Sequence, residues 1–215
     1  NKGIQVNEDL AVDFRIQTRP GTQRIARAAF DFARKNGKKN VTVVTKANIV
    51  KLSDGNFVKE VREVGKDYPE IEIQERLVDA MSAKLMDPEF NKGMEVILLP
   101  NLYGDIVTDI AAEQQGGLGT ASSSNLGNRY ALFEAIHGTA PYLVEHGRGK
   151  YADPCSLIRA AGMLMAHIGY GDRKKKLDQA LDICTVKERK TVITTMPDGA
   201  STAEFTDYLL ETLNK

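Results

Sequence analysis

The sequence predicts an α/β fold in which strands alternate with helices around a parallel or mixed sheet. Short runs of apolar or β-branched residues, such as residues 41–44 and 96–99, recur along the chain. Between them lie segments of roughly ten to fifteen residues with helical spacing, long enough to connect parallel strands. No Gly-x-Gly-x-x-Gly run follows a strand, so the sequence does not predict dinucleotide binding in the Rossmann manner.

The first elements follow from alternation and helical spacing. Residues 11–18 alternate as a strand, with Val12, Phe14 and Ile16 on one face. A turn at residues 18–21 precedes a helix over residues 22–36, in which Ile25, Ala29 and Phe32 recur at helical spacing. Up to residue 115 we then expect strands at 41–44, 71–73 and 96–99, and helices at 55–68, from 78 to about 86, and after residue 100.

A change of composition divides the chain. Residues 116–128 are rich in Gly, Ser and Asn, and we interpret them as a crossover between a domain of residues 1–115 and one of residues 116–215. The second domain is predicted to hold a strand at 130–134, an apolar helix at 156–168, a further helix, and a terminal helix at 202–213. The chain opens almost directly into a strand, so we expect a piece of a larger fold.

Charge and composition exclude several classes of protein. The 29 basic and 29 acidic residues balance, which leaves no basic footprint for nucleic acid or for an anionic membrane. No apolar stretch approaches the ~20 residues that a membrane span needs. Residues 1–3 show no signal peptide, and two cysteines without a spacing pattern indicate a reducing compartment. We expect a cytoplasmic protein, with the mitochondrial matrix as the alternative.

The run Asn-Leu-Tyr-Gly-Asp-Ile-Val-Thr-Asp at residues 101–109 carries two acids four residues apart. On a helix, Asp105 and Asp109 lie on the same face one turn apart, where their charges repel. A divalent cation removes that repulsion, and oxygen ligands suit Mg²⁺ or Mn²⁺. The alternative is a solvated helix face that carries two acids by chance.

Two further charged residues follow strands. Lys46 and Asn48 stand where a strand ends, the position at which α/β sheets gather their ligand sites. A lysine there can accept a proton when burial or a metal lowers its pKa, although a surface lysine is the simpler interpretation. Asp79 begins a helix after another strand, and either caps that helix or supplies a third metal carboxylate.

A His-Gly-Thr-Ala-Pro loop at residues 137–141 follows the predicted strand at 130–134. Gly138 allows the backbone to approach a ligand closely, and His137 can stack on a base or form a hydrogen bond to it. The loop is followed by a long polar stretch that ends at Asp153-Pro154.

Taken in order, the motifs KANIVKLSDG, VDA, NLYGDIVTD, GGLG, FEAIHGTAP and DP before a helix resemble those of the metal-dependent β-decarboxylating dehydrogenases. That family contains isocitrate, homoisocitrate, 3-isopropylmalate and tartrate/D-malate dehydrogenases. The resemblance covers nearly the whole chain and is closest to isocitrate dehydrogenases at KANIVKLSDGNF. It implies an isocitrate/isopropylmalate dehydrogenase-like fold, with two domains in three layers, whose N-terminal part is missing here.

The resemblance assigns roles to the metal and proton-transfer residues. Asp105 and Asp109 are expected to bind Mg²⁺ or Mn²⁺ in one protomer, while Asp79 and Lys46 reach across from the other protomer of a homodimer. Lys46 would accept the hydroxyl proton of the substrate, and Asn48 would lie near substrate and nicotinamide. Residues 1–115 would form an incomplete small domain for substrate, metal and dimer contacts.

The resemblance also implies that residues 116–215 form the C-terminal part of the large, cofactor-binding domain. Its expected adenosine contacts are His137, Gly138, Thr139, Ala140 and Pro141. Glu134 would lie near the nicotinamide end, and Asp153 stands where the family has an adenine-contacting Asn. NAD is favoured over NADP because Tyr142-Leu143 replaces the Lys-Tyr pair of NADP enzymes. A phosphate clamp built from Arg148, Lys150, Lys187 and Arg189 is the alternative.

The expected reaction is oxidative decarboxylation of a 2-hydroxy acid, with isocitrate to 2-oxoglutarate as the leading assignment. Homoisocitrate, 3-isopropylmalate and D-malate/tartrate remain alternatives, because the family's general-acid tyrosine, substrate arginines and specificity serine have no counterpart here. A non-catalytic regulatory chain is the other alternative. Such a chain is expected to have lost metal carboxylates or the HGTAP loop, and both are present.

Overall fold

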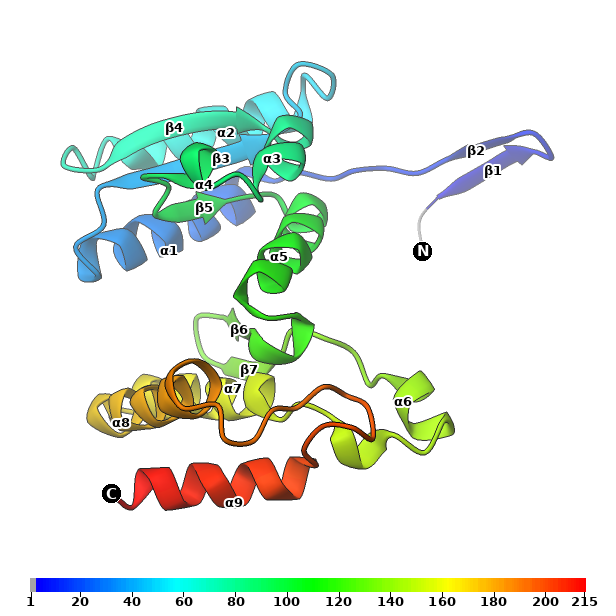
Figure 1. Cartoon of the computed structure of the whole chain (residues 1–215). Helices are drawn as coiled ribbons and strands as arrows, with labels where there is room; N and C mark the ends of the chain where they lie inside the picture. Colours follow the sequence, from blue (N-terminus) through cyan, green and yellow to red (C-terminus); the bar gives the residue numbers. More distant parts are fainter. Residues whose placement is uncertain (1–2) are drawn as a thin grey trace. The chain divides into compact units, whose positions relative to one another are not determined.

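A computed structural model describes residues 3–215. Asn1 and Lys2, two of the three residues on which the expectation of no signal peptide was based, lie outside the described residues. The chain forms two compact units that divide between Ala111 and Ala112 (Figure 1). The predicted boundary after residue 115 falls four residues later, at the end of the helix that crosses the division. Within residues 3–215, no helix is both long and apolar enough to span a bilayer.

A three-stranded parallel sheet organises the first unit. Its central strand is β3 (Asn40–Thr45), flanked by β4 (Glu72–Leu77) and β5 (Val96–Leu98). Every residue of β3 is buried, as expected of a strand covered on both faces. The parallel sheet predicted from the alternation of strands and helices is therefore confirmed.

Helices cover both faces of this sheet and make three layers. Helices α1 (Arg19–Lys35) and α2 (Ser53–Gly65) pack on one face, where Val41 and Val43 point into the largest apolar cluster. The neighbouring Val44 points to the opposite face, as the two-residue period of a strand requires. That face is covered by α3 (Val78–Lys84), α4 (Pro88–Asn91) and α5 (Asn101–Gln115).

The buried face of α1 differs from the stripe predicted for it. The helix spans the expected residues and begins three residues earlier, with Pro20 in its first turn and Thr18 as its N-cap. However, Ile25 and Phe32 are 46% and 56% exposed. The buried residues are instead Thr22, Ala26, Phe30 and Ala33. This helix carries two apolar stripes, and spacing alone cannot say which one meets the sheet.

The strand predicted at residues 11–18 is wrong beyond Val12. Strand β2 (Leu10–Val12) pairs with β1 (Ile4–Asn7) in an antiparallel hairpin, and residues 13–18 form no regular element. Phe14 and Ile16 are exposed. Alternation shows which face of a strand would be buried, but it supplies no partner strand for hydrogen bonds.

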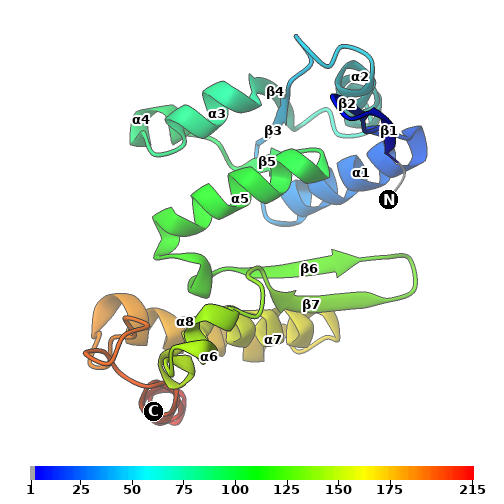
Figure 2. The ribbon, with the colours of Figure 1, turned by 90° about the vertical axis from the view of Figure 1, so that its right-hand side faces the viewer.

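The second unit combines an antiparallel hairpin with helices. Strands β6 (Ser122–Leu126) and β7 (Ala131–Ala135) pair in register and contact α7 (Cys155–His167), and Figure 2 shows the hairpin running along that helix. Helices α7, α8 (Gly171–Asp182) and α9 (Thr202–Leu213) enclose a second apolar core. Cys155 and Cys184 are buried and unpaired in this core.

Most elements of this unit match the prediction, with exceptions between residues 116 and 153 and at the end of α8. The stretch predicted to be a crossover contains the short helix η1 (Leu118–Thr120) and the strand β6. The polar stretch after the HGTAP loop contains α6 (Pro141–Glu145) and η2 (Gly149–Tyr151), and a π-helical turn, η3 (Ile183–Lys187), extends α8. Ser and Asn in β6 carry little strand propensity, and pairing with β7 overrides it.

Candidate functional site

Three polar segments leave the same edge of the first unit's sheet. Because β3, β4 and β5 are parallel, their carboxyl ends lie together. Lys46 follows β3 directly, Asp79 stands two residues after β4, and α5 with Asp105 and Asp109 begins after β5. The last residues of β3 and β4, Thr45 and Leu77, are register partners, which brings the Lys46 and Asp79 segments side by side.

Lys46 and Asp79 meet in an ion pair. The Nζ atom of Lys46 lies 2.7 Å from Oδ1 of Asp79, with 25% of the lysine side chain and 62% of the aspartate side chain exposed. The hydrogen bond from Lys46 holds the pKa of Asp79 below its usual value. Asp79 does not cap α3, since the N-cap is Leu77, whose side chain makes no capping bond. Of the two interpretations offered for Asp79, the N-cap is therefore wrong.

Asp105 and Asp109 both lie exposed on α5, at the spacing that places them on one helical face. The Nδ2 atom of Asn101 lies 3.5 Å from Oδ1 of Asp105, at the limit of a hydrogen bond. Among residues 3–215, no three acidic, His or Cys side chains come close enough together to hold a metal ion. The carboxylates of Asp79, Asp105 and Asp109 are hard oxygen donors, which fit Mg²⁺ or Mn²⁺ in kind.

The loop between β3 and α2 contains Asn48, which is exposed. This loop is closed by Asp54, whose Oδ2 atom accepts the backbone N–H of Lys46 at 2.7 Å. Asp54 is fully buried and forms an ion pair with Arg15. Neither residue was given a role from the sequence: Asp54 stands within the KANIVKLSDG motif, and Arg15 lies in a segment without regular structure.

The HGTAP loop follows β7 in the second unit and is exposed along its length. The Nδ1 atom of His137 lies 2.8 Å from the carbonyl oxygen of Gly138. Ala140 adopts a left-handed conformation with φ 47°, and α6 begins at the next residue, Pro141. Glu134 is exposed on β7 and accepts a hydrogen bond from Asn125 of β6 at 2.6 Å.

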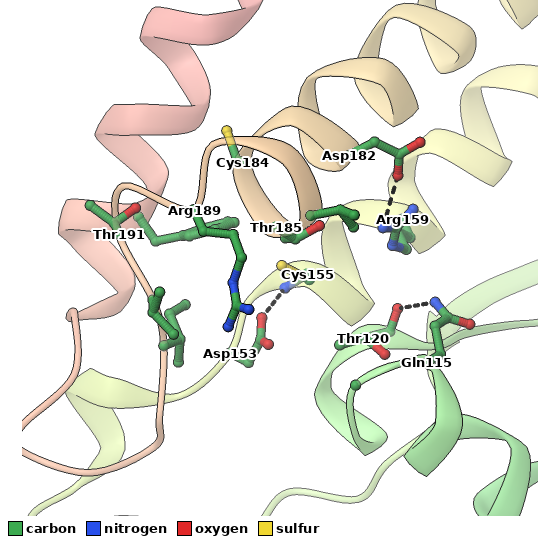
Figure 3. A pocket seen from close by; sticks show the side chains of 15 residues that line it. Gln115, Thr120, Asp153, Cys155, Arg159, Asp182, Cys184, Thr185, Arg189 and Thr191 are labelled. Carbon is green, nitrogen blue, oxygen red and sulfur yellow. Dashed lines mark hydrogen bonds and ion pairs between the residues drawn. The ribbon is translucent and has the colours of Figure 1, made fainter.

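A pocket of about 430 Å³ lies in the second unit (Figure 3). Asp153 lines it, and its Oδ1 atom accepts the backbone N–H of Cys155 at 2.8 Å. Figure 3 shows the side chain of Arg189 extending toward Asp153, across the pocket from Arg159 and Asp182. Gly116 of the GGLG turn also lines it, and a Cβ added to Gly119 would meet the Asp153 side chain at 2.8 Å. None of residues 137–141 lines this pocket.

Three of the four basic side chains considered for a phosphate clamp, Arg148, Lys150 and Lys187, do not line the pocket. Arg189 lines the pocket, whereas the guanidinium of Arg148 lies 5.2 Å from the ring centre of Tyr142. The ammonium of Lys150 lies 5.0 Å from the ring centre of Tyr151. Sequence reasoning missed Arg159 as a pocket residue, since a single arginine on an apolar helix carries no spacing signal.

Comparison with known proteins identifies the family of the chain. The model of the isocitrate/isopropylmalate dehydrogenase family matches residues 1–209. The chain is 42% identical over 212 residues to a mitochondrial regulatory subunit of the NAD isocitrate dehydrogenase of Dictyostelium discoideum, covering 96% of this chain and 58% of that protein. It is also 42% identical over 182 residues to the 3-isopropylmalate dehydrogenase of Archaeoglobus fulgidus, covering 85% of this chain and 54% of that protein.

Solved structures extend the agreement to the fold. The isocitrate dehydrogenase of Methylococcus capsulatus superposes with a TM-score of 0.90 at 35% identity, covering 99% of this chain and 63% of that one. The chain belongs to the isocitrate/isopropylmalate dehydrogenase family. The predicted fold is confirmed, and the chain spans 54% to 58% of the Archaeoglobus and Dictyostelium relatives.

Proposed function

We propose that the whole protein catalyses oxidative decarboxylation of a 2-hydroxy acid, with isocitrate as substrate and 2-oxoglutarate as product. In this proposal residues 1–115 contribute to substrate, metal and dimer contacts, and residues 116–215 contribute to cofactor binding. The observation that carries it is the Lys46–Asp79 pair, 2.7 Å apart where two parallel strands end. An acid and a base so placed suit proton transfer at a metal site.

The chemistry required of each residue fits its place. Asp79, Asp105 and Asp109 would hold Mg²⁺ or Mn²⁺, which lowers the pKa of a bound hydroxyl and stabilises negative charge left after loss of CO₂. Lys46, as its neutral amine, would take the hydroxyl proton as hydride leaves the same carbon for NAD or NADP. The 2.7 Å contact between Nζ of Lys46 and Asp79 places this side chain beside one of the proposed metal ligands.

We infer that the site is shared between two copies of the chain. Asp79 and Lys46 would come from one copy, and Asp105 and Asp109 from the other. Exposed apolar side chains support burial against a second copy: Ile25 and Phe32 form a stripe on α1. The hairpin of β1 and β2 also exposes Ile4, Val6, Leu10 and Val12, and a two-stranded hairpin is marginally stable by itself.

The cofactor assignment rests on the sequence after the HGTAP loop. Tyr142-Leu143 lacks the Lys-Tyr pair of NADP enzymes, so we propose NAD, held by residues 137–141 with Glu134 toward the nicotinamide and Asp153 toward the adenine. NADP is the alternative, since related proteins include the NADP isocitrate dehydrogenase of Rickettsia prowazekii, 44% identical over 161 residues. We propose a cytoplasmic location, with the mitochondrial matrix as the alternative.

A regulatory chain without turnover is the second candidate function. The observation in its favour is the name of the Dictyostelium relative, which is that of a regulatory subunit. Against it stand the four charged residues expected of a catalytic chain, Lys46, Asp79, Asp105 and Asp109, all present here.

A turnover screen tests the substrate assignment. The full-length protein is assayed with Mn²⁺ and either NAD or NADP on isocitrate, homoisocitrate, 3-isopropylmalate and D-malate. We expect reduction of the nicotinamide with isocitrate and NAD above all other pairs. A higher kcat/KM on another acid would replace isocitrate by that acid. Absence of turnover, with Mn²⁺ and nucleotide still bound, would establish the regulatory alternative.

Calorimetry tests the metal ligands directly. Mn²⁺ titrated into Asp105→Asn and Asp109→Asn should show weakened binding, because each variant loses one charged oxygen from an exposed face without leaving a cavity. Asp87→Asn, an exposed acid that caps the short helix α4, is the matched control and should bind Mn²⁺ as the wild type does. Unchanged affinity in the two α5 variants would show that these carboxylates are not metal ligands.

A further inference from the structure

We propose that Asp54 is the positioning residue that holds Lys46 in place for proton transfer, an inference that rests on the acid–base role proposed for Lys46. Asp54 lies in the first turn of α2 with no exposed surface. Its Oδ2 atom accepts the backbone N–H of Lys46 at 2.7 Å. A buried carboxylate thus fixes the first residue after β3.

The whole loop between β3 and α2 is built around the backbone of Lys46. The carbonyl oxygen of Lys46 accepts N–H groups from Ile49 at 2.9 Å and Val50 at 2.8 Å, and the N–H of Asp54 returns to the carbonyl of Val50 at 3.1 Å. Both backbone polar groups of Lys46 are therefore bound within this loop. Only its side chain remains free to turn, and it reaches Asp79.

Arg15 supplies the charge that a buried carboxylate needs. Its Nη1 atom lies 2.8 Å from Oδ1 of Asp54, and a charge buried without such a partner is strongly unfavourable. Both oxygens of Asp54 thus face cationic or N–H groups. An asparagine in its place would offer one acceptor and one donor group to those two partners.

The same arginine reaches the helix that carries the predicted metal ligands. Nη1 of Arg15 donates to the hydroxyl of Tyr103 at 2.7 Å, and its guanidinium lies 4.4 Å from the centre of that ring. Tyr103 lies in α5, less than one turn before Asp105. One chain of contacts therefore connects the backbone of Lys46 with α5.

Glu60 provides a control that distinguishes a positioning role of Asp54 from a general contribution to folding stability. Glu60 lies on the same helix, is 9% exposed, and pairs with Arg19 at 3.1 Å and with Gln23 at 2.7 Å. It is another buried, arginine-paired carboxylate of α2, but its partners lie on α1 and not in the Lys46 loop. Glu60→Gln therefore reproduces the loss of a buried charge without touching Lys46.

The kinetic arm compares Asp54→Asn with Glu60→Gln in the full-length protein. We expect Asp54→Asn to lower kcat about tenfold or more, to leave KM within about twofold, and to displace the acidic limb of the pH profile of kcat. Glu60→Gln should lower the melting temperature but keep kcat within about twofold and leave the pH profile unchanged.

Hydrogen exchange followed by mass spectrometry measures the hydrogen bond between Asp54 and the Lys46 amide, and it requires no turnover. Asp54→Asn should accelerate deuterium uptake in a peptide covering residues 46–52, because the Lys46 amide and Arg15 must then compete for a single acceptor oxygen. Glu60→Gln should leave uptake in that peptide as in the wild type. If the wild type turns over none of the four acids, the proposed function has failed, whereas exchange still decides whether Asp54 holds the Lys46 loop.

Equal kcat in Asp54→Asn and Glu60→Gln would overturn the proposal, as would a loss of kcat with unchanged uptake in residues 46–52.

Tyr103→Phe provides a milder variant if Asp54→Asn does not fold. It removes only the hydroxyl that accepts from Arg15. We expect it to lower kcat about two- to fivefold with faster uptake in the same peptide. Wild-type values for both would then overturn the proposal.

Discussion

At the scale of single residues, the account depends on Lys46 being held beside Asp79. The 2.7 Å contact gives the ammonium group one fixed partner, and the low pKa of Asp79 means that this partner stays charged at neutral pH. Both residues could be selected from the sequence because each follows a predicted strand, where α/β sheets gather their ligand sites. It could not select Asp54 or Arg15, because their contact forms only when a segment without regular structure meets α2.

Lys46→Met tests the proton-transfer role. The change keeps a long unbranched chain and removes the amine, so we expect kcat of the full-length protein to fall about a hundredfold to ten-thousandfold. Binding of NAD should change little, since the expected cofactor residues lie in the other unit. Steady-state kinetics and cofactor titration measure the two effects. A variant with the wild-type kcat and pH profile would remove Lys46 from the reaction.

Tyr208 makes a pH-dependent contribution to the stability of the second unit. Burial, followed by the hydrogen bond to Glu188, raises the pKa of Tyr208 to about 12. An unfolded chain ionises its tyrosines near pH 10, so the folded state holds this proton more tightly. The contribution is complete below about pH 10 and disappears as the pH rises toward 12.

Tyr208→Phe should therefore lose less stability than the wild type between about pH 10 and pH 12, as measured by urea unfolding. Lys190 also pairs with Glu188, and the raised pKa of Lys190 makes its pairing weaken with rising pH in both proteins. Only the difference between the two curves reports on Tyr208. Parallel curves across this window would show that the phenol has no such role.

At the scale of elements, sequence and structure agree where the information is local. Helix α9 matches the predicted residues 202–213, and both members of its capping box, Ser201 and Glu204, are visible in the sequence. The central strand β3 is equally clear from its β-branched residues. Residues 13–18 were misjudged because alternation supplies no partner strand, and β6 because its Ser and Asn carry little strand propensity.

Two glycines of α2 test how closely its buried end packs on the sheet. A Cβ at Gly65 would lie 2.4 Å from Cδ1 of Ile73 and 3.3 Å from Cζ of Phe30, whereas a Cβ at Gly55 would meet nothing within 4 Å. We expect Gly65→Ala to lower the free energy of unfolding by about 1–3 kcal/mol, because core side chains must move. Gly55→Ala should raise it by up to about 1 kcal/mol through helix propensity.

Urea unfolding of the two alanine variants measures this difference. Both substitutions add one methyl group to the same helix, so propensity effects are similar and the contrast isolates packing. Equal stability of the two variants would show that the Ile73 and Phe30 side chains adjust without cost.

At the scale of the whole molecule, the chain supplies the residues of a dehydrogenase site in separate groups. Lys46 pairs with Asp79, while Asp105 and Asp109 stand on α5 outside any group of three ligands among residues 3–215. The sequence alone indicated these groups, and the resemblance to β-decarboxylating dehydrogenases assigned them to different protomers. The exposed apolar stripe on α1 provides a surface that a second copy can cover.

The shared site is the central claim, and complementation tests it most directly. Full-length Lys46→Met and Asp105→Asn variants, each inactive by itself, are mixed, unfolded and refolded together. In a mixed dimer one site receives both defects and the other receives neither. Random pairing makes about half of the dimers mixed, so activity should return to roughly a quarter of the wild-type value. No recovery, with mixed dimers demonstrated by native mass spectrometry, would show that each site is built within one chain.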